Sequence, residues 1–174
     1  MPAVSAGLLV WRRQRLCSDG FSSDGVSSDG VLEVLIAHPG GPFWAKKHEG
    51  AWSIPKGEFD PATEPAMAAA AREFAEEIGS PAPPTTTWTE IGETTLKSGK
   101  RIIAWAAAVT ADIDVASLQS NTFEIEWPPR SGRRIAVPEV DEIRWCQPAE
   151  AIRLLNPAQR AFVQRLMARL AEND

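Results

Sequence analysis

The sequence predicts an α/β fold in which helices pack on a mixed central sheet. Three observations support this prediction: apolar runs of strand length open the chain, one strongly amphipathic helix follows, and helical patterns close it. The 174 residues are 44% apolar and 24% charged, an ordinary globular mix in a chain long enough to bury a core. No shift in composition marks an internal boundary, so we expect a single domain over residues 1–174.

Two apolar runs, Val4–Trp11 and Leu32–Ala37, are expected to form the first strands. The segment between them repeats Ser-Asp-Gly with a five-residue period. Asp-Gly pairs form turns, and such a polar repeat cannot bury enough surface to fold alone. We therefore expect a flexible loop over residues 17–30 that expands a hairpin. The spacing of its aspartates matches no calcium-binding loop.

The clearest helix is expected between Pro65 and Gly79. A proline costs little in a first helical turn, and glycine often follows a helix end. Small or apolar residues recur between them at helical spacing and predict the buried face, namely Met67, Ala70, Ala71, Phe74 and Ile78.

Later elements are expected from similar patterns. Residues 88–96 and 102–109 are typical of two strands around a Ser-Gly-Lys turn, and residues 142–146 alternate like a strand. A glycine and several prolines interrupt the segment before that last strand. From Pro148 the pattern is helical, and Pro157 divides it into a short and a longer helix.

Composition also excludes several kinds of protein. Cys17 and Cys146 lie far apart with no Cys/His cluster, so a reducing compartment fits and no zinc site is expected. No apolar run approaches the ~20 residues that cross a bilayer. The first arginines follow the first apolar run, which is the reverse of a secretory signal. We therefore expect a cytoplasmic protein with no membrane partner.

The net charge of −5 comes from 18 Lys and Arg against 23 Asp and Glu. An acidic chain argues against a protein that binds long nucleic acid. The charge is unevenly placed, because residues 56–77 hold six acids and two bases and so carry −4 of the total −5. The acidity of the chain is therefore concentrated in one short segment.

Three glutamates of the predicted helix, Glu73, Glu76 and Glu77, are spaced i, i+3 and i+4 and share one face. Their repulsion and their position near the helix C-terminus both disfavour the helix. Arg72 can pair with Glu76 one turn away, which offsets part of this cost. Carboxylates are the ligands that Mg²⁺ and Mn²⁺ prefer, so the cluster is either a solvated acidic face or a metal site.

The surrounding sequence resembles the Nudix box of the Nudix hydrolase family, G-x5-E-x7-R-E-U-x-E-E-x-G-U, where U is apolar. The match covers residues 57–80, and its motif residues in register are Glu64, Arg72, Glu73, Phe74, Glu76, Glu77 and Gly79. There are two departures: six residues rather than five separate Gly57 from Glu64, and Ser80 stands at the last apolar position. Neither departure removes a carboxylate.

The likeness extends beyond the box. The segments PFWAKKHEGAWSIPKGE and SNTFEIEWPPRSGR are similar to a bacterial branch of the family described as predicted nucleoside triphosphate pyrophosphohydrolases. The resemblance implies a Nudix-type α/β/α sandwich with a mixed central sheet. It also implies a hydrolase that cleaves a diphosphate linkage in a nucleoside polyphosphate, either an NTP or a dinucleoside polyphosphate, by attack of water on phosphorus.

The resemblance further implies Mg²⁺ or Mn²⁺ as the cofactor. Its ligands would be the three box glutamates, the carbonyl of Gly57 and one glutamate beyond the box. Glu139, six residues before Trp145, is the first candidate for that distal ligand. Its rivals are Glu142, Glu124 and Glu126.

The resemblance also assigns catalytic roles. Glu73 or Glu139 would take the proton from the attacking water, and Glu77 would be essential for metal-dependent cleavage. Arg72 would brace the carboxylates rather than touch the substrate. Glu64 would be structural, at a helix start where the dipole favours a negative charge.

Substrate contacts are expected from basic and aromatic residues outside the box. The candidates for phosphate are Lys56 and the cluster Arg130, Arg133 and Arg134, with Lys46 and Lys47 as a second cluster. A nucleobase could stack on Trp44, Phe123 or Trp127. Each of these side chains could instead be a solvated or a core residue, and the sequence does not identify the base.

Two alternatives stay open. One is a Nudix-fold module that binds a nucleotide or a partner without turnover, against which the complete set of box carboxylates argues. The other is a different enzyme on the same fold, for which no further Cys or His constellation exists. Many relatives are dimers, so a homodimer is compatible with the resemblance, although the sequence identifies no interface.

Overall fold

The computed structural model describes residues 3–14, 30–109 and 113–173 of the chain. Its main sheet has six strands in the order β4-β5-β1-β2-β8, with β3 paired to β1 outside this order. The strands are β1 (Val4–Gln14), β2 (Val31–Pro39), β3 (Lys56–Glu58), β4 (Thr89–Thr95), β5 (Arg101–Ala108) and β8 (Val140–Cys146). The helices are α1 (Ala66–Ile78), α2 (Pro148–Leu154) and α3 (Arg160–Asn173).

Strand β1 organises the sheet. It pairs with β5 in parallel, from Val4 beside Arg101 to Trp11 beside Ala108, and with β2 and β3 in antiparallel orientation. The sheet is therefore mixed, as the sequence predicts. Strand β8 closes the other side by pairing with β2 in antiparallel orientation.

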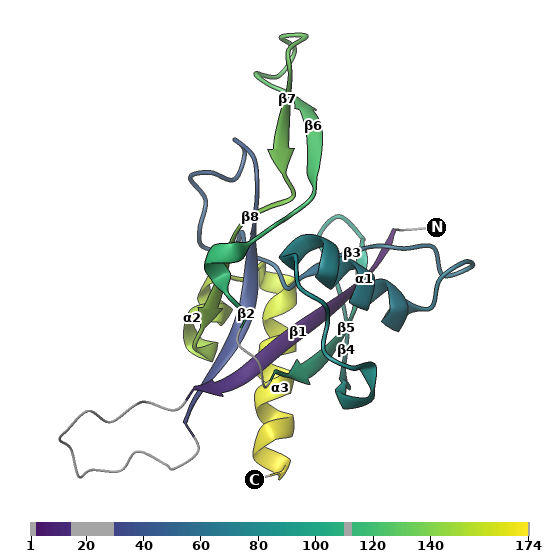
Figure 1. The fold of residues 1–174 in the computed structure, drawn as a ribbon, viewed down its shortest axis with the longest axis vertical. Coiled ribbons are helices and arrows are strands. Elements are labelled where there is room, and N and C mark those ends of the chain that lie inside the picture. Colours follow the sequence, from purple (N-terminus) through teal and green to yellow (C-terminus); the bar gives the residue numbers. More distant parts are fainter. Residues whose placement is uncertain (1–2, 15–29, 110–112, 174) are drawn as a thin grey trace, which may run out of the picture.

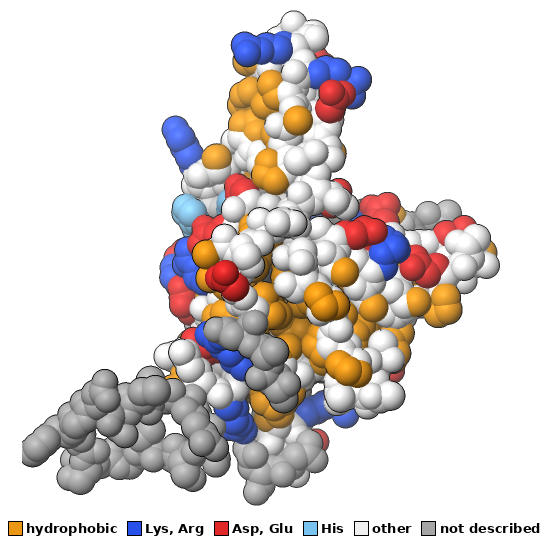
Figure 2. Space-filling model, viewed as in Figure 1, with side chains coloured by type: hydrophobic (Ala, Val, Ile, Leu, Met, Phe, Trp, Pro, Cys, Tyr) orange, Lys and Arg blue, Asp and Glu red, His pale blue; other side chains and the backbone are white. Residues whose placement is uncertain are grey.

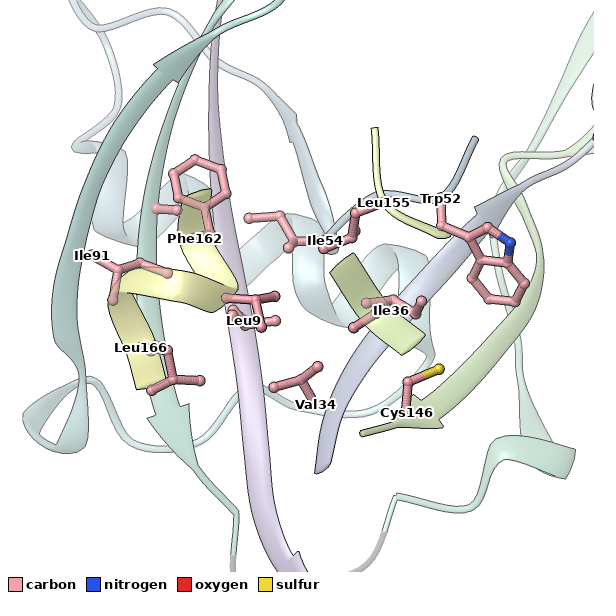
Figure 3. Close-up of a cluster of buried hydrophobic side chains, with 14 of the residues drawn as sticks. Leu9, Val34, Ile36, Trp52, Ile54, Ile91, Cys146, Leu155, Phe162 and Leu166 are labelled. Atoms are coloured by element: carbon pink, nitrogen blue, oxygen red, sulfur yellow. The ribbon is translucent and has the colours of Figure 1, made fainter. Parts of the chain in front are cut away.

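Helix α1 covers one face of the main sheet, and α2 and α3 cover the other (Figure 1). Successive side chains of β1 point to opposite faces of the sheet. Leu8 and Val10 pack in the hydrophobic cluster beneath α1, and Leu9 packs in the cluster on the opposite face. The opposite cluster also holds Phe162 of α3 and Trp52, all fully buried (Figure 3). The predicted α/β/α sandwich is confirmed.

Helix α1 begins and ends where the sequence indicates. Pro65 is its N-cap, and Gly79 follows its last residue with a φ of 75°. The N–H of Gly79 donates to the carbonyl of Ala75 at 2.9 Å, which closes the last turn. Phe74 and Ile78 of the predicted stripe are buried against the sheet.

A second sheet of two strands, β6 (Thr122–Glu126) and β7 (Arg134–Pro138), stands away from the body of the protein (Figure 1). Its register places Phe123 opposite Val137. Figure 2 shows basic side chains at the tip of this hairpin and hydrophobic side chains along it. The sequence analysis treats this segment as broken by prolines and does not predict the two strands.

Lys56–Glu58 forms the short strand β3 because it pairs with the start of β1. The predicted flexible loop over residues 17–30 lies outside the described residues, except for Gly30. None of the helices in the described part of the chain combines the length and apolar character needed to cross a membrane.

Candidate active site

An open cleft of about 450 Å³ is lined by residues of α1, β3 and the β6–β7 hairpin, among others. Five segments that are distant in sequence line it: β3, α1, the turn before β5, β6, and the junction of β7 and β8. The lining residues are Lys56, Gly57, Glu58, Glu73, Glu76, Glu77, Lys100, Phe123 and Glu139. The cleft thus brings the three box glutamates together with Glu139.

Strand β3 lies directly against the glutamates of α1. A side chain at Gly57 would overlap the carboxylate of Glu73, so any larger residue would displace that carboxylate from its present position. The backbone N–H of Lys56 donates to Oε2 of Glu77 at 2.8 Å. Pairing of β3 with β1 therefore places backbone groups of the loop beside two of the three box glutamates.

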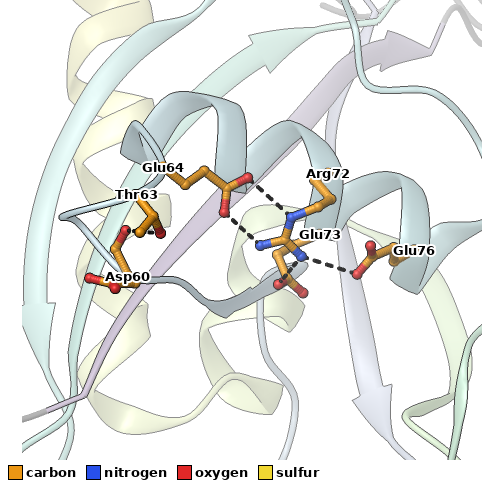
Figure 4. A network of polar contacts seen from close by, with 6 residues as sticks. All are labelled: Asp60, Thr63, Glu64, Arg72, Glu73 and Glu76. Carbon is orange, nitrogen blue, oxygen red and sulfur yellow. Dashed lines mark hydrogen bonds and ion pairs between the residues drawn. The ribbon is translucent and has the colours of Figure 1, made fainter.

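Arg72 links three glutamates of the box (Figure 4). Its Nε and Nη2 donate to the Glu64 carboxylate at 3.1 and 2.9 Å. Its Nη1 donates to Glu73 Oε1 at 2.6 Å and to Glu76 Oε2 at 3.2 Å. The predicted pair of Arg72 and Glu76 is present, and Glu64 holds the guanidinium in place.

A compact turn occupies the loop in which the sequence departs from the box. The carbonyl of Asp60 accepts hydrogen bonds from the N–H groups of Thr63 and Glu64, both at 3.0 Å. The Asp60 carboxylate also accepts from the N–H of Ala62 at 2.9 Å. The turn lies in the loop that carries the additional residue, and Glu64 at its end contacts Arg72.

The environment of the cluster disfavours its negative charge. Burial raises the pKa of Glu77 to about 7, although Lys56 lowers it in part. Burial also raises the pKa of Glu73 against the opposing effect of Arg72, and the charge of Glu139 raises both pKa values further. Glu64 behaves differently, because its hydrogen bonds from Arg72 lower its pKa. Burial is therefore the main reason why the charged forms of Glu73 and Glu77 are disfavoured, and neighbouring carboxylates add to it.

The structure separates Glu139 from its rivals for the distal acid. Glu139 lines the cleft, and its backbone bonds to Asn121 and Gly40 at 2.8 and 3.0 Å. The rivals have other partners and do not line the cleft: Glu142 pairs with Arg144, Glu124 pairs with Arg134, and Glu126 accepts from the N–H of Gly132.

The predicted substrate contacts are spread more widely. Lys56 and Phe123 line the cleft, and Phe123 is 43% exposed. The arginines at positions 130, 133 and 134 belong to the outer part of the β6–β7 hairpin and do not line the cleft. Trp127 packs edge-on against Phe43 with ring centroids 4.9 Å apart, and exposed Trp44 lies under the Lys47 ammonium group. The roles of Arg130, Arg133, Arg134, Trp44 and Trp127 stay predictions.

The cleft holds an ion pair, between Glu58 and Lys100, that the sequence does not predict. Lys100 Nζ lies 2.7 Å from Glu58 Oε1, and both side chains line the cleft. Lys100 sits in the turn between β4 and β5, and only the parallel pairing of β5 with β1 brings it beside β3. No local pattern in the sequence carries this signal.

No three acidic, His or Cys side chains in residues 3–14, 30–109 and 113–173 converge into a ready-made metal site. Arg72 engages Glu73 and Glu76, and the backbone of Lys56 engages Glu77, so the carboxylates point at protein donors. The cluster nevertheless has the oxygen donors that hard divalent cations prefer, and all of them line one cleft. Glu73, Glu76 and Glu77 with Glu139 therefore fit such a cation in chemistry.

Comparison with known structures agrees with this architecture. An Ap4A hydrolase from C. elegans in a binary complex matches with a TM-score of 0.60 and 21% identity, covering 98% of each chain. The NUDIX domain of NrtR from Shewanella oneidensis, complexed with ADP ribose, matches with a TM-score of 0.61 and 13% identity, covering 98% of this chain and 89% of that one. A MutT protein from Methanosarcina mazei Go1 has a TM-score of 0.56 and 19% identity, covering 97% and 96% of the two chains. At these identities the likeness shows the fold.

The family comparison is more direct. No curated protein matches the sequence. The model of the NUDIX domain matches residues 29–166, which is most of the chain and includes the whole carboxylate cluster. The chain belongs to the NUDIX domain family.

Proposed function

We propose that the protein is a metal-dependent hydrolase that cleaves a diphosphate linkage in a nucleoside polyphosphate. The observation that carries this proposal is the cleft itself. It gathers the three box glutamates with Glu139 from the junction of β7 and β8, and Lys56 and Lys100 line the same cleft. Clustered carboxylates with nearby ammonium groups suit a metal-bound polyphosphate, because metal and lysine together balance its charge.

The proposed metal ligands are Glu73, Glu76, Glu77 and Glu139, with the carbonyl of Gly57. Mg²⁺ or Mn²⁺ held there would stabilise the negative charge that develops on the phosphate oxygens. Arg72 would then keep the glutamates in position through its fork with Glu64. Gly57 would let β3 stay close enough for its backbone to reach the same site.

The remaining roles belong to the protein side chains. Glu73 or Glu139 would accept the proton of the attacking water, since both line the cleft. Lys56 would contact a phosphate of the substrate. Phe123, the exposed aromatic residue at the cleft, would stack on the nucleobase.

The substrate class rests on chemistry and on two matched proteins. One of them is an Ap4A hydrolase, and the other was crystallised with ADP ribose. Both names refer to compounds in which a nucleoside carries a phosphate chain. We therefore propose that the substrate of this protein is an NTP or a dinucleoside polyphosphate.

The test incubates the full chain with Mg²⁺ or Mn²⁺ and a panel of NTPs, dinucleoside polyphosphates and ADP-ribose, followed by product identification. We expect metal-dependent cleavage that EDTA abolishes and that Glu77→Gln lowers by orders of magnitude. Glu139→Gln is compared with Glu142→Gln, whose carboxylate pairs with Arg144 outside the cleft, and only the first should lose activity. Activity in EDTA would overturn the mechanism. A ligand that binds and is recovered unchanged would indicate a binding module instead.

A further inference from the structure

The ion pair between Glu58 and Lys100 has no role in the mechanism above, although both residues line the cleft. We propose that Lys100 is a phosphate-binding residue that sets the affinity for polyphosphate, and that Glu58 occupies its ammonium group until the substrate displaces it. This inference rests on the proposed function of the same cleft. It adds Lys100 as a second phosphate-binding residue beside Lys56, and Glu58 as a carboxylate that competes with the phosphate.

The charges around the cleft support the first half of the inference. Its lining residues include five glutamates and two lysines. Four of the glutamates are the proposed metal ligands, which leaves Glu58 as the carboxylate outside that group. The phosphates of a long substrate that extend past the metal need other cations, and Lys56 and Lys100 are the two cationic residues that line the cleft.

The placement of Lys100 suits such a role. Its backbone is fixed by a closed turn, in which its carbonyl accepts from the N–H of Leu96 at 2.9 Å and Gly99 adopts a φ of +85°. The next residue, Arg101, donates its N–H to the carbonyl of Ala3 at 3.1 Å. A flexible side chain on a fixed backbone can exchange one anionic partner for another without any change of fold.

The contact with Glu58 is easily exchanged. The Glu58 side chain is 64% exposed, whereas that of Lys100 is 23% exposed, so the carboxylate can move into solvent while the lysine stays at the cleft. An ion pair with one largely exposed partner contributes little to stability. Glu58 offers Lys100 one carboxylate, whereas a polyphosphate offers several anionic oxygens that are also held by the metal. Glu58 therefore acts as a competitor that the substrate replaces.

A purely structural ion pair makes the opposite prediction. If Glu58 and Lys100 only joined β3 to the turn before β5, removing either partner would have the same effect, because the same contact is lost. If Glu58 competes with phosphate, the two substitutions act in opposite directions. Lys100→Met would weaken phosphate binding and Glu58→Gln would strengthen it.

The experiment measures binding of inorganic tripolyphosphate to the full chain by calorimetry with saturating Mg²⁺. We expect Lys100→Met to weaken binding by about tenfold and Glu58→Gln to tighten it by about twofold to fivefold. Lys100→Arg should restore most of the affinity, because it keeps the charge. Lys97→Met is the matched control, since Lys97 lies in the same turn, is exposed and does not line the cleft.

The outcomes separate the two proposals. Equal weakening by Lys100→Met and Glu58→Gln, or wild-type affinity in Lys100→Met, would overturn the inference. If the expected pattern of binding appears but no compound of the panel is cleaved, the inference about Lys100 stands and the proposed hydrolysis fails. If a nucleotide is cleaved, KM should follow the same order of variants as tripolyphosphate binding, while kcat changes less.

Discussion

The carboxylate of Glu64 accepts two hydrogen bonds from Arg72, at 3.1 and 2.9 Å, across eight residues of sequence. This fork orients the guanidinium so that its remaining nitrogen reaches Glu73 at 2.6 Å. The helix thus carries its own cation beside its acidic face. The planar geometry of arginine is needed for this arrangement, because a lysine ammonium cannot form the same fork.

Arg72→Lys keeps the positive charge and removes the fork. We expect a fall in kcat/KM of about tenfold or more, because the glutamates lose their positioning, and a loss of only about 1 kcal/mol in the free energy of unfolding. Steady-state kinetics and urea denaturation measure the two effects. Arg153→Lys is the control, since Arg153 pairs with exposed Glu49 away from the cleft. Equal activity of the two variants would contradict a positioning role for Arg72.

Gly57→Ala should place a methyl group where the Glu73 carboxylate lies. We expect the free energy of unfolding to fall by about 1–3 kcal/mol, as is usual when a packed site is overfilled. The cause can be isolated with a double-mutant cycle, because Glu73→Ala removes the atoms that would overlap. Urea denaturation of the four proteins should show a smaller cost of Gly57→Ala when residue 73 is alanine. An unchanged cost would show that the close approach is not the reason for the glycine.

The metal-free protein should become less stable as the pH rises through the range in which Glu77 ionises. Burial raises the pKa of Glu77 to about 7, whereas a glutamate in an unfolded chain titrates near about 4.3. The folded state therefore binds the proton more tightly, and stability falls between these two values.

Glu77→Gln tests this pH dependence. In EDTA near pH 8, we expect the variant to exceed wild type in free energy of unfolding by on the order of 1–3 kcal/mol, and the difference should shrink near pH 5. Urea denaturation at both pH values measures it. Glu90→Gln, at an exposed site on β4, should change neither value. A Glu77→Gln protein less stable than wild type at pH 8 would contradict the prediction.

Phe123→Ala tests where the nucleobase lies. Phe123 lines the cleft, so its loss should raise KM for a nucleotide by about tenfold, which corresponds to one stacking contact, and should leave tripolyphosphate binding unchanged. Trp44→Ala is the comparison, because Trp44 is exposed but does not line the cleft. A larger effect of Trp44→Ala on the KM for the nucleotide would indicate that the base stacks on Trp44 rather than on Phe123.

Local sequence is sufficient to predict a helix or strand when its pattern is strongly periodic or its partners lie nearby in the chain. Helix α1 follows from its apolar stripe and from the residues at its two ends, Pro65 and Gly79. The β6–β7 hairpin was missed because its prolines suggest a break, whereas two strands joined by a loop can hold proline at their ends. Strand β3 has no local signal of its own, because Lys56–Glu58 is three residues long and is defined by its pairing with β1.

The same distinction applies to the active site. The spacing of the box glutamates places them on one helix face, and the structure agrees because spacing on a helix is a local property. The sequence favours Glu139 as the distal metal ligand over Glu142, Glu124 and Glu126, and its position in the cleft supports this prediction. Lys100 could not be found, because its place beside Glu58 depends on the parallel pairing of β5 with β1.

The pairing of β1 with β5 and of β2 with β8 has a consequence for how the chain folds. Leu8 of β1 lies beside Trp105 of β5, and Leu35 of β2 lies beside Trp145 of β8. The partner strands of β1 and β2 are therefore synthesised much later than β1 and β2 themselves. Contacts of such long sequence separation form slowly, and until they form β1 and β2 present unpaired edges. Strand β8 also follows directly after Glu139. The step that closes the sheet during synthesis therefore also delivers the last acidic residue to the cleft, so that a nascent chain lacks the complete site until its core is nearly finished.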